Sequence, residues 1–197
     1  MKLLQIVTLA LVLTHSAHSF AESVDLQSSK VIWSGSKVVG DTHTGHIKIK
    51  SAVVNFDKET PLSGQVTLDM PSITNTDLTD AKWNGKLVGH LNSPDFFDTA
   101  KFKTANLKIN KITKLNKDTY NLIGNLTIKS TTLPVTLKSS LVKKNDNTKV
   151  LKVDFKFDRT KYGIKYGSGN FFSNLGDKMI SDEVAVSVEL LINKKKK

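Results

Sequence analysis

The sequence predicts an all-β fold of about eight antiparallel strands, arranged as a barrel or a sandwich, with a short helical insertion around residues 77–98. Apolar and polar residues alternate along separate runs, as in strands that bury one face. Short polar turns join neighbouring runs, and one central stretch instead spaces its apolar residues as a helix does. The interior of such a barrel is either filled by side chains or holds one small ligand, and periodicity does not separate these cases.

The two ends of the chain are set apart from this domain. Lys2 and the apolar run 3–13, which is too short to span a membrane, precede small residues near Ala21. This pattern predicts a cleavable signal peptide at residues 1–21, with cleavage after Ser19 as an alternative and an uncleaved membrane anchor as the competing interpretation. Residues 22–193 are predicted to form one domain, and the basic run 194–197 a disordered tail.

Eight runs are predicted as strands. The clearest is 150–158, where Leu151, Val153, Phe155 and Phe157 alternate with charged residues. In the second run the alternation reverses around residues 51–54, which predicts a bulge. The predicted strands are 31–35, 45–56, 62–70, 102–112, 120–129, 133–142, 150–158 and 184–192.

The stretch 76–92 is predicted as a short, irregular helix. Asp77 or Thr79 is its expected cap. Gly85 and Gly89 weaken the helix. Its apolar side is predicted to consist of Trp83, Leu87, Val88 and Leu91.

Two adjacent phenylalanines follow this helix. Ser93 and Pro94 have the residue types of an N-cap and first position, so a short second turn is expected to carry Phe96 and Phe97. A turn this short cannot bury both rings by itself. We therefore expect it to act as a lid or end plug of the barrel, with both rings directed toward a cavity.

Composition limits the partners of the protein. The net charge of +11 comes from lysine, with Arg159 as the only arginine, and the lysines alternate along predicted strands as on a solvated outer face. Because arginine and aromatic residues do not cluster on one element, no nucleic-acid partner is expected. Transient attraction to anionic membrane surfaces is the functional interpretation of this charge. The absence of cysteine excludes disulfides, thiol catalysis and cysteine metal sites.

No group of residues predicts catalysis or metal binding. His43 and His46 lie three apart on a predicted strand and so point to opposite faces. The glycines of 163–169 resemble a phosphate loop only superficially, because no convincing helix follows them. The aspartate pairs at 77/80 and 95/98 are explained by helix capping. The sequence therefore predicts a protein that is not an enzyme and has neither catalytic residues nor a metal site.

Aromatic residues give the more informative pattern, because many fall on predicted inward faces or on the helical insertion. They predict either an ordinary core or the wall of a ligand cavity. The predicted interior and lid residues are Trp33, Trp83, Leu87, Leu91, Phe96, Phe97, Phe155 and Phe157. The candidates for contact with a ligand head group are His90, Arg159, Tyr162 and Tyr166, although a structural hydrogen bond for His90 and a loop-bracing ion pair for Arg159 are alternatives.

Four segments, in order through nearly the whole domain, resemble the YceI-like family. They are KLVGHLNSPDFFD at 86–98, YNLIGNLTIK at 120–129, DRTKYGIKYGSG at 158–169 and LGDKMISDEV at 175–184. The resemblance implies a lipocalin-like antiparallel barrel, exported to the periplasm, that binds a polyisoprenoid, a quinone or another long-chain lipid as its hydrophobic ligand. It also implies an association with stress responses, and a homodimer. Phe102 and Lys103 stand where members commonly have Tyr-Pro, and Ser130 replaces a usual glycine, but neither departure touches the inferred cavity.

Three functional hypotheses follow. The leading one is a periplasmic lipid-binding protein that carries or sequesters an isoprenoid-type lipid. The alternative is a solid-core basic protein of the envelope that binds anionic polymers or a protein partner. An enzyme acting on the lipid head group is the third, and it lacks any motif.

Overall fold

The structure, a computed structural model, describes residues 20–194. Nine strands and one α-helix form in that part of the chain, with 3₁₀ turns at Met70–Ser72, Arg159–Tyr162 and Gly176–Lys178. The helix is α1 (Ala81–Asn92). The strands are β1 (Phe20–Lys37), β2 (Thr42–His46), β3 (Lys48–Asp57), β4 (Thr60–Asp69), β5 (Thr104–Lys114), β6 (Thr119–Ile128), β7 (Thr131–Lys143), β8 (Thr148–Asp158) and β9 (Ile180–Asn193).

The strands close into an antiparallel barrel. From β3 to β9 each strand pairs with the next along the chain, and β9 pairs with β1. The start of β1 pairs with β3, with Phe20 opposite Phe56, whereas its second half pairs with β2, with Ile32 opposite His46. The predicted all-β fold is confirmed, as a barrel of eight strands with β2 as an additional strand beside β1.

The sequence prediction missed the first half of β1. Residues 20–30 are largely polar and do not alternate, because the strand is kinked there. The pairing with β9 shifts between Asp25 and Lys30. The Asp25 carboxylate accepts hydrogen bonds from the N–H groups of Gln27 and Ser28, both at 3.1 Å. The Ser29 hydroxyl accepts from the N–H of Leu191, which holds the kink against β9.

The second predicted strand is two strands. It divides at Ile47, between β2 and β3, where the N–H of Ile47 donates to the carbonyl oxygen of Val31 at 3.1 Å, in register with the pairing of β1 and β2. The pairing of β3 with β4 then shifts between Ile49 and Ser51, next to the predicted bulge. Ile47 itself is buried.

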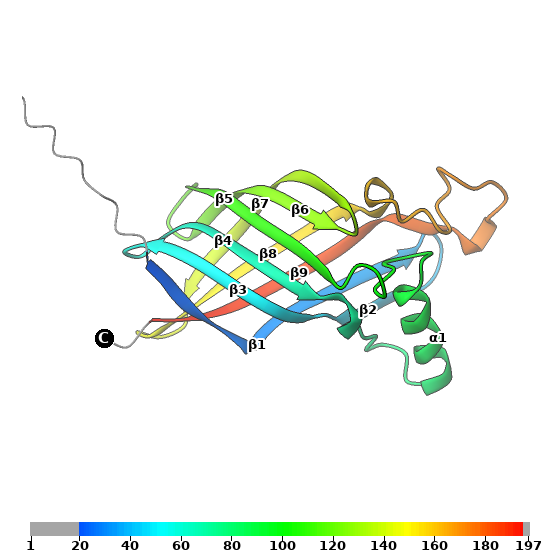
Figure 1. The fold of residues 1–197 in the computed structure, drawn as a ribbon, viewed down its shortest axis with the longest axis horizontal. Helices are drawn as coiled ribbons and strands as arrows, with labels where there is room; N and C mark the ends of the chain where they lie inside the picture. Colours follow the sequence, from blue (N-terminus) through cyan, green and yellow to red (C-terminus); the bar gives the residue numbers. More distant parts are fainter. Residues whose placement is uncertain (1–19, 195–197) are drawn as a thin grey trace, which may run out of the picture.

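The two halves of the barrel differ in their contents. In Figure 1, α1 and the connection from β8 to β9 lie at one end, and the described chain termini lie at the other. The half near the termini is filled by one apolar cluster that includes Phe56, Tyr120 and Leu151. A second cluster occupies the half near α1 and includes Trp33, Leu91, Phe96 and Ile164. The cavity described below lies in this second half.

The structure describes only part of the two chain ends for which predictions were made. Residues 1–19 of the predicted signal peptide lie outside the described residues, whereas Phe20 and Ala21 belong to β1. Lys194, predicted to begin a disordered tail, is instead bound to the barrel, since its N–H donates to Asn147 O and its ammonium lies 3.0 Å from Glu59. Within residues 20–194 no helix has the length and apolar character needed to cross a membrane.

Candidate functional site

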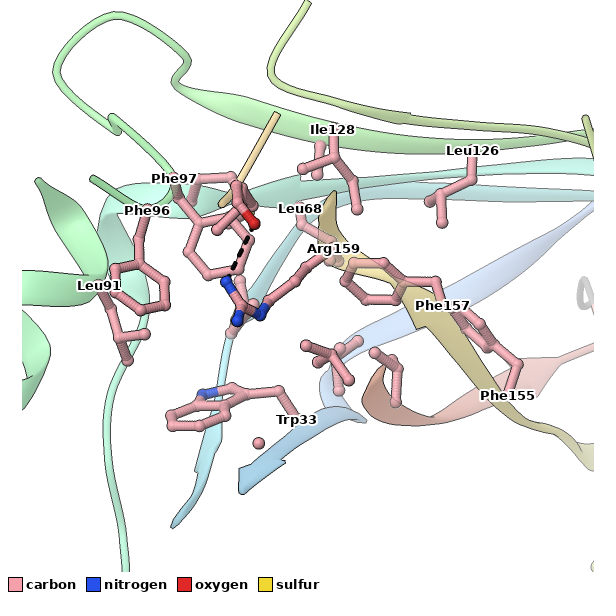
Figure 2. A pocket seen from close by; sticks show the side chains of 18 of the residues that line it. Trp33, Leu68, Leu91, Phe96, Phe97, Leu126, Ile128, Phe155, Phe157 and Arg159 are labelled. Carbon is pink, nitrogen blue, oxygen red and sulfur yellow. Dashed lines mark hydrogen bonds between the residues drawn. The ribbon is translucent and has the colours of Figure 1, made fainter. Parts of the chain in front are cut away.

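An apolar cavity of about 120 Å³ lies inside the barrel, at the end covered by α1. Figure 2 shows side chains from several strands and from the segment after α1 converging on it. Its accessible wall is apolar throughout. The lining includes Val31, Trp33, Gly35, Ile47, Leu68, Met70, Leu91, Phe96, Phe97, Ala105, Leu126, Ile128, Phe155, Phe157, Arg159, Ile164, Ile180, Ser181, Val184 and Val186.

The strand period explains how the wall forms. Successive side chains of a strand point to opposite faces, so residues two apart share a face. Phe155 and Phe157 of β8 lie opposite Val186 and Val184 of β9, and all four line the cavity. Further along both strands, Leu151, Val153, Val188 and Leu190 fill the packed half on the same inward face. One alternating pattern therefore builds both the packed core and the cavity wall.

Trp33 is held at the cavity by a specific hydrogen bond. Its indole N–H donates to the carbonyl oxygen of Thr74 at 3.0 Å. Gly45, opposite Trp33 on β2, makes room for this bond. A Cβ at Gly45 would come within 2.6 Å of the Trp33 Nε1 atom and would collide with the Thr74 carbonyl. The ring of Trp33 is consequently buried and fixed in one orientation.

The predicted turn after α1 forms as a hydrogen-bonded turn, and its role as a lid stays a prediction. Asp80, not Asp77 or Thr79, caps α1, because its carboxylate accepts from the N–H of Trp83 at 3.0 Å. After α1, the N–H groups of Phe96 and Asp98 donate to Ser93 O, and the N–H of Phe97 donates to Leu91 O at 3.1 Å. Phe96 and Phe97 both line the cavity.

A lysine from the barrel fastens this turn. The Lys129 ammonium donates to the carbonyl oxygen of Phe96 at 2.9 Å, and lies 3.5 Å from that of Pro94. At the α1 end of the turn, Thr99 donates from its hydroxyl to the Asn92 amide oxygen at 2.6 Å. The turn is thus attached to both α1 and the loop that follows β6.

Three rings meet beside the turn and join it to the β8–β9 connection. The ring of His90 lies 4.8 Å from that of Phe96 and 4.5 Å from that of Tyr166, both edge to face. Phe96 and Tyr166 are 5.6 Å apart. The His90 Nε2 atom is 3.5 Å from the Asp95 carboxylate. These residues connect the two segments that cover the barrel end.

Arg159 braces the β8–β9 connection. A guanidinium has five N–H donors. Here they reach the carbonyl oxygens of Ile164, Tyr166, Ile180 and Ser181 at 2.8–3.1 Å, and the Asp182 carboxylate at 3.2 Å. The side chain is 2% exposed, and its neighbours satisfy its donors. Of the two interpretations of Arg159, the geometry favours the loop brace over the head-group contact.

Two residues predicted to line the interior, Trp83 and Leu87, do not reach the cavity. The prediction that Trp83 lies in the interior is wrong, since its side chain is 58% exposed on the outer part of α1. Leu87 packs against the cluster around the cavity, without lining it.

Arg159 is among the lining residues, but the other three head-group candidates lie outside the lining. Tyr162 is buried behind Phe157, with ring centres 5.6 Å apart, and burial raises the pKa of its hydroxyl. His90 and Tyr166 lie beside the turn, as described above.

Several wall residues were missed as site residues although their signal was present. Leu68 and Met70 belong to a predicted alternating face, and Leu126 and Ile128 to the quoted segment 120–129. Their alternation marked them as inward-facing. It carried no information on whether the space beside them was filled.

The described residues 20–194 contain no group of three or more His, Asp or Glu side chains placed to hold a metal ion. His43, considered above for such a role, is paired with Asp77 at 2.8 Å.

Sequence comparison places the chain in a family. A model described as the YceI-like domain matches residues 23–192. The UPF0312 protein of Yersinia pestis (strain Pestoides F) is 31% identical over 135 residues, which are 68% of this chain and 66% of that protein. The chain therefore spans just under two thirds of the length of the curated relatives it matches.

Structural comparison agrees. BcnA of Burkholderia cenocepacia is 27% identical with a TM-score of 0.69, covering 86% of this chain and 99% of that one. A polyisoprenoid binding domain from Saccharophagus degradans has a TM-score of 0.66 over 89% of this chain and 98% of its own, and at 13% identity this likeness concerns the fold alone. The family match and these folds together mean that this chain belongs to the YceI-like domain family.

Proposed function

We propose that the protein binds the apolar chain of an isoprenoid-type or similar long-chain lipid in the cavity beneath α1, for carriage or sequestration. The observation that carries the proposal is the unequal barrel, in which one half is packed solid and the other encloses a cavity with a wholly apolar accessible wall. A structural neighbour named as a polyisoprenoid binding domain supports the choice of ligand class.

The cavity volume sets how much of a ligand is held. A dry cavity of about 150 Å³ accommodates benzene, so the 120 Å³ here corresponds to about five carbon atoms, or one isoprene unit. At ~0.8 kcal/mol per buried methylene, five carbons contribute about 4 kcal/mol, which corresponds to a millimolar dissociation constant. Useful affinity for a long lipid therefore requires contact with more of the chain.

The turn that carries Phe96 and Phe97 is the part that makes room. Its two rings close the cavity toward α1, and it is held by hydrogen bonds and by the Lys129 ammonium, not by strand pairing. In the proposed bound state a longer chain displaces these rings and occupies their place. No catalytic step is part of the proposal.

The proposed location is the periplasm, reached after cleavage of the predicted signal peptide. This location and the homodimer implied by the family resemblance stay predictions.

Organic extraction of purified protein, followed by mass spectrometry, tests whether a lipid is bound. The two tryptophans provide a direct second test, because Trp33 lines the cavity and Trp83 does not. In the Trp83→Phe variant, geranylgeraniol is expected to change the emission of Trp33 in a saturable way. The Leu91→Asp change, which places a carboxylate at the cavity wall, is expected to abolish that response.

An exposed leucine at the other end of the barrel supplies the matched control. Leu115→Asp, on the turn between β5 and β6, is expected to leave the response intact. If no lipid is extracted and Trp33 does not respond, the cavity is not a binding site. The alternative, a basic protein that binds anionic polymers or a protein partner, is then favoured.

A further inference from the structure

Exposed apolar side chains gather at the barrel end that contains the cavity. Trp83 of α1 is 58% exposed, and Phe171 and Phe172 of the β8–β9 connection are 47% and 50% exposed. Val38 and Val39, in the turn between β1 and β2, are also exposed, and the N–H of Val38 bonds to Met179 O at the end of the same connection. Figure 1 shows α1 and the β8–β9 connection extending beyond the strands at this end.

These side chains are not needed to hold the fold. The packing of α1 on the barrel comes from Leu87 and Leu91, in its second half, whereas Trp83 lies in its first turn and is outside both apolar clusters. Phe171 and Phe172 are likewise outside both clusters, and the connection is braced by Arg159 instead. Large apolar residues exposed together on such segments mark an interaction surface.

The charges beside these rings are mainly basic. Residues 80–92 contain two lysines and one aspartate, Asp80, whose carboxylate accepts from the N–H of Trp83. Residues 159–179 contain three lysines, one aspartate and the buried Arg159. The Lys86 ammonium lies 4.4 Å from the Trp83 ring centre, and that of Lys165 lies 4.5 Å from Phe171. An aromatic ring with an adjacent lysine suits the boundary of an anionic bilayer, where the ring enters the head-group region and the ammonium meets phosphate.

We propose that this end of the barrel docks on the surface of an anionic phospholipid bilayer. The docking residues are Trp83, Lys86, Lys165, Phe171 and Phe172, which lie on α1 and on the β8–β9 connection at the cavity end of the barrel. The docked protein presents the Phe96–Phe97 turn to the membrane, so an apolar chain passes between bilayer and cavity with little exposure to water. Only this last consequence rests on the proposed lipid-binding function, because docking itself requires no ligand.

Basic charge alone does not select this end. A surface pocket at the opposite end is lined by Lys114, Lys117, Lys143 and Lys194, of which Lys143 and Lys194 are paired with Asp146 and Glu59. Attraction by charge alone would therefore dock the protein in either orientation. The aromatic residues are what distinguish the two ends, and the experiment must separate their contribution from that of charge.

The Trp33→Phe variant, which retains Trp83 as its single tryptophan, measures docking. With phosphatidylglycerol vesicles free of isoprenoid, we expect a blue shift of Trp83 emission, quenching by lipids brominated on their acyl chains, and flotation of the protein with the vesicles. With phosphatidylcholine vesicles we expect weak or no binding. Strong salt is expected to reduce binding, because the lysine contribution is screened.

Paired substitutions test the orientation. Phe171→Ser with Phe172→Ser is expected to weaken vesicle binding by about tenfold or more. Lys86→Gln with Lys165→Gln is expected to weaken it by about fivefold per lysine. The controls at the opposite end, Leu115→Ser and the pair Lys114→Gln with Lys117→Gln, are expected to have little effect.

Each outcome decides for or against docking. Equal losses from the two ends, or unchanged binding after loss of both phenylalanines, overturn the proposal, as does absence of binding to phosphatidylglycerol. The response of Trp33 to geranylgeraniol in the Trp83→Phe protein, measured without vesicles, is independent of docking. If Trp33 responds to geranylgeraniol but the protein does not bind vesicles, the lipid-binding function stands and the docking proposal is refuted. If the protein binds vesicles but Trp33 does not respond, docking stands and the lipid-binding function is refuted.

Discussion

The substitution Gly35→Val, which adds a side chain inside the cavity, separates the effect on ligand binding from the effect on stability. Gly35 lies two residues after Trp33 on β1, so it shares the inward face, and it lines the cavity. A Cβ built there meets no atom within 4 Å. The substitution Gly35→Val therefore places a branched side chain in open space on an extended strand, with no backbone obstacle.

The expected effects on stability and binding have opposite signs. Burying about three carbon groups at ~0.8 kcal/mol each contributes about 2.4 kcal/mol. Replacing glycine within a regular element adds up to about 1 kcal/mol, and imperfect fit subtracts about 1 kcal/mol. The free energy of unfolding should rise by about 2 kcal/mol. The same three groups occupy most of the space for about five ligand carbons, so affinity should fall by about fiftyfold.

Urea unfolding and titration with geranylgeraniol, each followed by Trp33 emission in the Trp83→Phe protein, measure the two quantities. Because the new side chain lies near Trp33, ligand retained after gel filtration should also be counted by mass spectrometry. Gly85→Ala is the matched control. It lies on α1, its Cβ also meets no atom within 4 Å, and it stabilises the helix by up to about 1 kcal/mol without entering the cavity. Unchanged affinity in a stabilised Gly35→Val protein would refute the assignment of the ligand to this cavity.

Three further predictions concern charged groups. Lys149→Met leaves the Glu22 carboxylate, which is 4% exposed, without its cation. We expect this change to lower the free energy of unfolding by about 3 kcal/mol, and adding Glu22→Gln to restore most of the loss. Hydrogen bonds from the Lys149 and Lys194 ammonium groups lower the pKa of Glu59 to about 2. The contribution of Glu59 to stability is therefore present above its ordinary pKa of 4.5 and lost as pH falls toward 2. Because the carboxylate is 66% exposed, this contribution is small. In unfolding measurements over this pH range, we expect Glu59→Gln to remove less than about 1 kcal/mol of the acid dependence. Arg159→Lys, which cannot reproduce the planar set of hydrogen bonds, is expected to destabilise the protein by about 2 kcal/mol and to speed proteolysis of the β8–β9 connection.

The alternating strands were predictable because burial of one face leaves a direct trace in the residue order. Phe155 and Phe157 were placed inward on this ground, and they line the cavity. The first half of β1 left no such trace, since its kink is held by local hydrogen bonds of Asp25 and Ser29. The size of the cavity was also not predictable. It depends on how side chains from all the strands meet across the barrel, which no single run contains.

Helical spacing identified an apolar side of α1 but not what covers it. Steps of four residues advance about 40° beyond a full turn, so Trp83 points about 80° away from Leu91 around the helix axis. The barrel covers the end of the helix near Leu91, and Trp83 faces solvent. The role of Arg159 could not be read from the sequence for a different reason. Its partners are mostly backbone carbonyl groups, and no residue type marks them in a sequence.

The packed half of the barrel explains how the other half can remain hollow. At about 24 cal/mol per Å³, an empty apolar cavity of 120 Å³ costs about 3 kcal/mol, a large share of the stability of an ordinary domain. The closed β1–β9 ladder and the cluster around Phe56 and Leu151 hold the strands in place independently of the contents of the cavity. A ligand chain that fills the space restores the missing contacts. Bound lipid should therefore raise the unfolding temperature of the native protein, and should do so much less in Gly35→Val, where the side chain already supplies those contacts.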